Sequence, residues 1–254
     1  MVKNSIGLVL SGGGARAAAH IGALKALNEN GIFPTHISGA SAGALIGVLY
    51  CNGYTPSEIL ELAKSQEFLK IFKIGFNNKG LTEMTRLKAF LNKHIKDDFN
   101  ELKIPLSVSV SNLNLGAFEI ISSGKLIDYI VASCAVPLLF KPIVINDIQY
   151  VDGGLLNNFP IEPLLNTCDK IIGISVDGNP YKEKIKGVLR ITERCLKLAI
   201  WNTIQERIKK CDVSLIINEH TEYNMFSFNK SEELFKIGYN SVIHSMKEIK
   251  DALN

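Results

Sequence analysis

Residues 5–31 read SIGLVLSGGGARAAAHIGALKALNENG, and this stretch decides the fold. Its first six residues, which end at Leu10, are mostly apolar and predict a buried β-strand. After the glycines, Ile21, Leu24 and Leu27 recur at the spacing of one helix face until Gly31 ends the pattern. The stretch therefore predicts a strand, a glycine loop and a helix, in that order.

The same order repeats directly afterwards. A short strand near residues 36–38 leads into residues 42–52, which are apolar on all sides and predict a helix buried in the core. Further helices are expected after Thr55 and Thr82 and over residues 188–211 and 231–252, and further strands over residues 106–110, 118–121, 143–151 and 170–176. Since strands alternate with helices and no linker divides the chain, we expect one α/β domain over residues 1–254. Its mainly parallel central sheet should carry helices on both faces, which gives three layers.

The composition excludes several classes of protein. The chain has 28 basic and 25 acidic residues, a balance that does not suggest a nucleic-acid binder. Its cysteines lack CxxC spacing, so neither a disulfide framework nor a zinc site is indicated: Cys51, Cys134, Cys168, Cys195 and Cys211. The apolar run from Ile6 to Leu10 is too short for a signal peptide or a membrane span. We therefore expect a cytoplasmic protein, with peripheral membrane contact as an alternative.

The pentapeptide Gly39-Ala40-Ser41-Ala42-Gly43 lies between the second strand and its helix. A nucleophilic serine needs a tight, strained turn that exposes its Oγ, and flanking glycines relieve the steric conflict there. The following helix directs its positive end at the same point. The alternative is a turn of small residues that only permits close packing. The strand before the motif and the helix after it favour Ser41 as a nucleophile.

The loop Gly12-Gly13-Gly14-Ala15-Arg16 follows the first strand, where backbone N–H groups can converge on an anion. A phosphate is one candidate, but no Gly-Lys-Ser/Thr follows, and alanine takes the place of the third glycine of a dinucleotide fingerprint. An oxyanion hole is the other candidate, since fixed donors stabilise the charge of a tetrahedral intermediate. Arg16 would brace this loop or add positive potential.

A serine nucleophile needs a base, and the five histidines are weak candidates because none follows a strand in an evident catalytic loop. Asp152-Gly153-Gly154 directly follows a β-rich stretch, and Asp177-Gly178 is its rival. A third interpretation is that Asp152 only caps its own turn. An aspartate base requires a pKa raised by roughly three units from about 3.9, and hence a partly desolvated site.

Together these motifs resemble the patatin-like phospholipase family, as a bacterial-type single-domain member. The resemblance runs from about Ser5 to Val176 and includes further stretches: His20-Ile21-Gly22, Ser133-Cys134-Ala135-Val136-Pro137, Phe140-Lys141-Pro142 and Asn157-Asn158-Phe159-Pro160. The chain departs from the family pattern at Ala17, Cys134 and Leu138-Leu139, positions that bear on the shape of the pocket. Beyond Val176 the motifs cease.

The resemblance implies a serine acyl hydrolase, phospholipase A-like, that cleaves acyl esters of glycerolipids through an acyl-enzyme. It implies a dyad of Ser41 and Asp152 without histidine, and so favours Asp152 over Asp177. It assigns the oxyanion hole to residues 12–16, requires no metal or cofactor, and makes Gly39, Gly43, Gly153 and Gly154 the turn glycines of the dyad.

Residues 65–80 combine apolar side chains with Lys70 and Lys73, which predicts either a lid or an element that touches a membrane; packing on the core is the alternative. The expected partner is a lipid or another acyl ester, and no nucleic acid. Two other functions stay open: an acyltransferase that uses the same dyad, and a non-catalytic lipid- or nucleotide-binding module. The sequence does not determine the oligomeric state, lipid head group or chain length.

Overall fold

A computed structural model describes residues 5–71, 84–178, 185–218, 223, 225 and 227–254. In this part of the chain a central sheet of eight strands has the order β5-β6-β3-β2-β1-β7-β8, and β4 also pairs with β3. The strands are β1 (Ile6–Leu10), β2 (His36–Ala40), β3 (Leu106–Asn112), β4 (Ala117–Ile121), β5 (Ile143–Ile145), β6 (Ile148–Asp152), β7 (Lys170–Ser175) and β8 (Val213–Ile216). The five strands β3, β2, β1, β7 and β8 are mutually parallel, while β4 and β6 pair with β3 in the antiparallel sense. The predicted mainly parallel sheet is confirmed.

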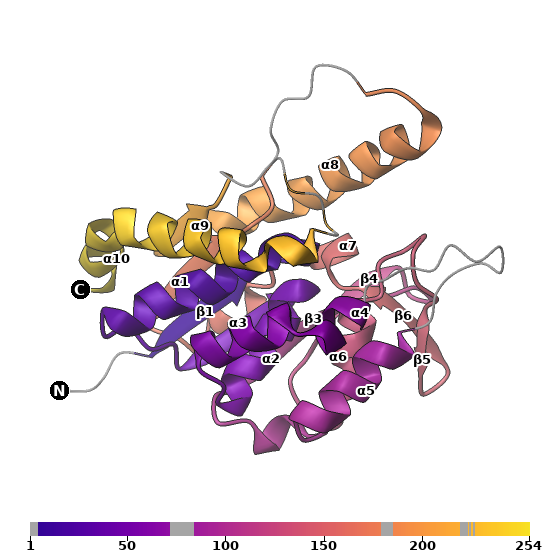
Figure 1. Cartoon of the computed structure of the whole chain (residues 1–254), viewed down its shortest axis with the longest axis horizontal. Helices are drawn as coiled ribbons and strands as arrows, with labels where there is room; N and C mark the ends of the chain where they lie inside the picture. The colour runs from indigo at the N-terminus through magenta and orange to yellow at the C-terminus, as the bar shows by residue number, and fades with distance from the viewer. Residues whose placement is uncertain (1–4, 72–83, 179–184, 219–222, 224, 226) are drawn as a thin grey trace.

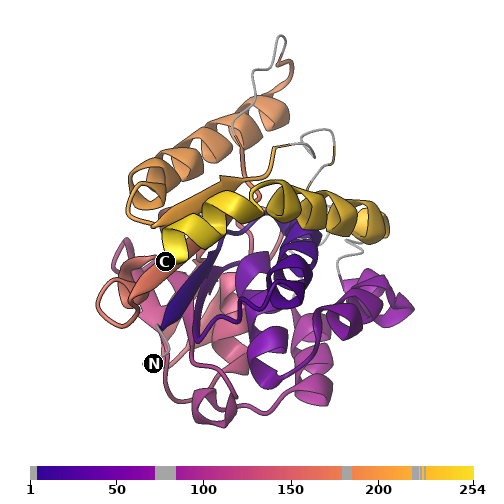
Figure 2. The ribbon, with the colours of Figure 1, turned by 90° about the vertical axis from the view of Figure 1, so that its left-hand side faces the viewer.

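Helices cover both faces of the sheet (Figures 1 and 2). They are α1 (Ala18–Glu29), α2 (Ala42–Asn52), α3 (Pro56–Lys64), α4 (Gln66–Ile71), α5 (Thr85–His94), α6 (Ile127–Ser133), α7 (Gly154–Asn157), α8 (Val188–Ile208), α9 (Ser231–His244) and α10 (Met246–Leu253), with 3-10 turns η1 (Gly14–Ala17), η2 (Phe99–Glu101), η3 (Glu162–Leu164) and η4 (Phe228–Lys230). The central strand β1 divides the core: Leu8 and Leu10 pack with α1, α2 and α9, while Val9 packs on the opposite face with Ile204 of α8. This alternation follows from the two-residue repeat of a strand.

Several predicted elements have different bounds in the structure. The β-rich stretch 143–151 is a hairpin, because Asn146 and Asp147 adopt φ of 50° and 63° and turn the chain between β5 and β6. The long helical pattern of residues 231–252 is two helices that meet at Ser245. The strand β8 was not predicted, and it extends the sheet beyond β7. No helix among the described residues is long and apolar enough to cross a membrane.

The predicted start of α3 is confirmed as a capping box. Thr55 Oγ1 accepts a hydrogen bond from the amide of Glu58 at 3.3 Å, and the Glu58 carboxylate accepts one from the amide of Thr55 at 2.8 Å. Residues 72–80 of the predicted lid lie outside the described residues. In its described part, α4, the side chains of Phe68 and Ile71 are buried.

Helices α1 and α9 cross at a pair of glycines. A Cβ on Gly22 would lie 1.9 Å from the carbonyl oxygen of Phe235, and one on Gly238 would lie 1.9 Å from that of Ala19. Both glycines are required by this close approach of two backbones. The crossing fixes α9 against α1, the helix that follows the glycine loop in the chain.

We predict that Gly238→Ala lowers the free energy of unfolding by about 1–3 kcal/mol, because the added methyl group forces the two helices apart. Urea denaturation measures this. Lys236→Ala, at an exposed position of the same helix, is the control and should stay within about 0.5 kcal/mol of the wild type. Equal stability of G238A and K236A would contradict the close crossing.

Candidate active site

Ser41 lies on a strained turn between β2 and α2. Its backbone adopts φ of 51° and ψ of −128°, a region that a non-glycine residue rarely occupies. The two flanking glycines are needed by close contacts: a Cβ on Gly43 would lie 2.4 Å from the carbonyl oxygen of Leu10, and one on Gly39 would lie 2.8 Å from the amide of Ala44. The local geometry thus has the form expected of a nucleophile turn.

Asp152, at the end of β6, faces this serine. The hydroxyl of Ser41 donates a hydrogen bond to Asp152 Oδ2 at 2.5 Å, and the amide of Gly154 donates one to Asp152 Oδ1 at 2.7 Å. A Cβ on Gly153 would lie 1.9 Å from the carbonyl oxygen of Ser109, so this position also needs glycine. The two side chains meet although they are 111 residues apart in the sequence.

Burial changes the chemistry of this carboxyl group. Desolvation raises the pKa of Asp152 to about 7, although the hydrogen bonds from Ser41 and Gly154 lower it, and the negative charge of Asp177 raises it further. A carboxylate with such a pKa is a suitable general base at neutral pH. The desolvated site that an aspartate base requires is therefore present.

The end of α6 positions both residues, and sequence reasoning did not assign it a role. Ser133 Oγ accepts a hydrogen bond from the amide of Ser41 at 2.8 Å and donates one to the carbonyl oxygen of Ser109 at 2.7 Å. The carbonyl groups of Ala135 and Ser133 accept from the amides of Asp152 and Gly153, at 3.0 and 3.2 Å. Residues 133–135 thus hold Ser41 and Asp152 in place next to each other. Its motif in the sequence, Ser133-Cys134-Ala135-Val136-Pro137, was the available signal.

The first glycine loop lies against Ser41, since a Cβ on Gly12 would be 2.9 Å from Ser41 Cβ. Three of its five amides already have acceptors within the protein: Gly12 donates to Asn158 Oδ1, Ala15 to the carbonyl oxygen of Met225 and Arg16 to that of Gly13. Among the described residues, the amides of Gly13 and Gly14 have no acceptor. The donors open to a ligand are therefore fewer than the five predicted.

Asp177, the rival aspartate, braces this loop and does not contact Ser41. Its carboxylate binds the guanidinium of Arg16 at 2.5 Å and accepts from Asn158 Nδ2 at 3.3 Å. Arg16 Nε in turn donates to the carbonyl oxygen of Gly13 at 3.2 Å. Asn158 therefore links the segment that follows Asp152 to the glycine loop, a role that sequence reasoning missed.

The histidines occupy other places. His20 lies in α1, and its Nε2 atom is 2.8 Å from the carbonyl oxygen of Ser11. The side chain of His36 is hydrogen-bonded to that of Thr35, and the ring of His94 packs against that of Tyr54. His220 lies outside the described residues. In the described part of the chain the side-chain hydrogen bond of Ser41 goes to Asp152 and not to a histidine. No cluster of metal-binding side chains occurs among the described residues.

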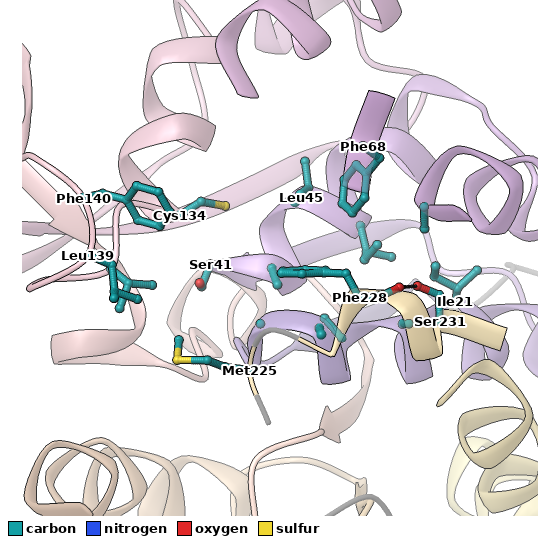
Figure 3. Close-up of a pocket in the computed structure, with 18 residues that line it drawn as sticks. Ile21, Ser41, Leu45, Phe68, Cys134, Leu139, Phe140, Met225, Phe228 and Ser231 are labelled. Carbon is teal, nitrogen blue, oxygen red and sulfur yellow. Dashed lines mark hydrogen bonds between the residues drawn. The ribbon is translucent and has the colours of Figure 1, made fainter. Parts of the chain in front are cut away.

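A cavity of about 630 Å³, including its open mouth, contains Ser41 and is mostly apolar. Figure 3 shows Cys134, Leu139 and Phe140 on one side of the serine and Ile21, Phe228 and Ser231 on the other. The remaining lining residues are Gly14, Ala15, Ala17, Ala18, Ala42, Leu45, Ile46, Ala63, Phe68, Val136 and Met225. Such a lining suits an apolar ligand, and the side chain of Ser41 lies at the wall of the cavity.

The chain belongs to the patatin-like phospholipase family, whose model matches residues 8–165. Among curated relatives, Neuropathy target esterase sws of Drosophila melanogaster is 32% identical over 279 residues, which cover 94% of this chain and 19% of that protein. Lysophospholipase NTE1 of Cryptococcus neoformans var. neoformans is 34% identical over 205 residues, which cover 72% of this chain and 12% of that protein. The chain thus spans less than a fifth of the length of these relatives.

A solved structure has the same fold. VipD from Legionella pneumophila superposes with a TM-score of 0.55 at 15% sequence identity, over 97% of this chain and 67% of that one. The predicted family and fold are both confirmed.

We predict that Asp152→Asn stabilises the protein more at pH 8 than at pH 5. The carboxyl group is protonated in the folded state up to a pKa of about 7 but ionises near 3.8 when unfolded, so rising pH destabilises the wild type across this window. The asparagine does not ionise and escapes this loss. Urea denaturation at both pH values should show a gain in unfolding free energy about 2–3 kcal/mol larger at pH 8. An equal effect of the substitution at both values would contradict a raised pKa.

Proposed function

We propose that this chain is a serine acyl hydrolase that cleaves carboxylic esters of glycerolipids, with Ser41 as nucleophile and Asp152 as general base. The observation that carries the proposal is the 2.5 Å hydrogen bond from the strained Ser41 to a buried carboxylate, at the wall of an apolar cavity. Membership in the patatin-like phospholipase family supports it. So do the names of two relatives, an esterase and a lysophospholipase.

In the first half of the proposed reaction, Ser41 Oγ attacks the ester carbonyl while its proton passes to Asp152 Oδ2. The negative charge that develops on the carbonyl oxygen is stabilised by the amides of Gly13 and Gly14 and by the N-terminus of α2. Collapse of this intermediate transfers the proton from Asp152 to the departing alcohol and leaves an acyl group on Ser41. The raised pKa of Asp152 suits both transfers.

In the second half, Asp152 removes a proton from water, which attacks the acyl-enzyme and releases the fatty acid. The proton then returns to Ser41 Oγ. An acyltransferase would differ only in that an alcohol replaces this water. We favour water because it needs no binding site for a second substrate.

We also propose that the single catalytic domain includes the part of the chain beyond the family match. Met225, Phe228 and Ser231 line the cavity together with Ser41. Residues from α9 and the segment before it therefore complete the wall of the site, and an active fragment should need them.

Ser41→Ala and Asp152→Asn should each reduce turnover of a p-nitrophenyl ester by at least about a thousandfold, because each removes half of the dyad. Ser41→Ala should also abolish labelling by a fluorophosphonate probe. Ser214→Ala and Asp128→Asn make the same changes away from the cavity and are the controls, with turnover near that of the wild type. Persistent labelling of S41A would reject Ser41 as the nucleophile.

The pH dependence of kcat/KM should rise through an apparent pKa near 7, because only ionised Asp152 accepts the proton. Asp177→Asn should move this limb to lower pH, since it removes a negative charge that raises the pKa of Asp152 and releases the cation of Arg16. Glu162→Gln, which removes the partner of Arg207 elsewhere, is the matched control and should leave the limb in place. A limb that D177N does not move would contradict this coupling.

A further inference from the structure

The long helix α8 packs on the sheet along only part of its length. Its second half contributes Ile200, Trp201, Ile204 and Ile208 to the core that surrounds Val9 and Phe159. Its first half begins beyond the carboxyl end of β7 and extends away from the body of the molecule, at the upper right of Figure 1. Two halves of one helix therefore have different environments.

The first half carries an exposed apolar stripe. The side chains of Val188, Ile191 and Leu198 are 80%, 48% and 38% exposed, and Cys195 between them is also exposed. Their spacing of three, four and three residues places all four on one face of the helix. Helices of soluble proteins normally turn such a face toward the core, so a contiguous exposed one indicates a contact surface.

Positive charge accompanies this stripe. Residues 186–198 contain four basic residues and one acidic residue, so their net charge of +3 equals that of the whole chain. Lys186 is exposed at the start of the helix, and Arg194 and Lys197 are partly exposed. Arg194 lies one turn from both Ile191 and Leu198. An apolar stripe bordered by cations is complementary to the surface of a bilayer that contains anionic lipids.

The stripe lies at the edge of the sheet that also holds Ser41. In parallel strands all carboxyl ends meet at one edge, and both the turn at Ser41 and the connection from β7 to α8 leave from it. The turn that follows the carboxyl end of β3 adds Leu113 and Leu115, which are 44% and 73% exposed. A surface bound to the first half of α8 would therefore face the end of the molecule that contains the cavity.

We propose that the first half of α8, with Val188, Ile191, Cys195 and Leu198 and their neighbouring cations, docks the protein on anionic bilayers. The apolar side chains enter the interface between head groups and acyl chains, while the exposed Lys186 binds the lipid head-group charge and the net positive charge of residues 186–198 attracts the anionic surface. Docking directs the carboxyl edge of the sheet toward the lipid. It does not depend on the chemistry at Ser41.

Flotation of the purified protein with vesicles tests this proposal. Vesicles of phosphatidylcholine with phosphatidylglycerol should carry the wild type, those of phosphatidylcholine alone should not, and high salt should weaken the binding. The triple variant Val188→Gln, Ile191→Gln and Leu198→Gln should bind at least about tenfold more weakly. The control variant Phe33→Gln, Leu165→Gln and Ile243→Gln, which changes exposed apolar residues of other elements, should bind like the wild type.

Turnover of a short soluble p-nitrophenyl ester, measured in parallel, should be equal in the wild type and both triple variants. Loss of turnover in all three would count against the proposed hydrolase and not against docking. Docking is overturned if anionic vesicles do not carry the wild type, or if the α8 variant floats as well as the control variant. It is also overturned if light scattering shows a wild-type dimer that only the α8 variant dissociates while no vesicle binds. In that case the stripe joins two copies of the chain.

Discussion

The hydrogen bond from the amide of Ser41 to Ser133 Oγ is the interaction on which the rest of the site depends. A backbone at φ of 51° and ψ of −128° is unfavourable for serine and persists only where its surroundings hold it. Ser133 supplies that support at the end of α6, and the same segment receives the amides of Asp152 and Gly153. The segment of residues 133–135 therefore holds both the strained turn at Ser41 and the carboxylate of Asp152 in place. The sheet contributes by bringing β2, β3 and β6 together at this point.

Burial supplies the second requirement of the proposed dyad, a carboxylate basic enough to accept a proton from serine. Asp152 is buried, and the protein around it excludes the water that would hold its pKa near 3.8. The carboxylate of Asp177 is a second negative charge near Asp152, but it pairs with Arg16, which binds the glycine loop.

The sequence predicted the features that local patterns determine. These features depend on neighbouring residues, and all appear in the structure: the strand, glycine loop and helix of residues 5–31, the turn at Ser41 and the helix that starts after Thr55. Features that arise from contacts across the fold were missed. Ser133 binds Ser41, which is 92 residues away, and Asn158 binds Gly12, which is 146 residues away. Strand β8 has only four residues, and its pairing with β7 defines it more than its sequence does. The pattern of residues 143–151 predicts one strand and not a hairpin, because Asn146-Asp147 is a weak turn signal beside strong apolar runs.

The central claim is that Ser41 is a nucleophile served by Asp152 and by the amides of Gly13 and Gly14. A crystal structure of the protein after reaction with a fluorophosphonate tests it most directly, because the adduct resembles the tetrahedral intermediate. The account predicts phosphorus bonded to Ser41 Oγ, the phosphonyl oxygen within about 3 Å of both glycine amides, and the alkyl chain in the apolar cavity. An adduct on another residue, or a phosphonyl oxygen directed away from the glycine loop, would contradict it.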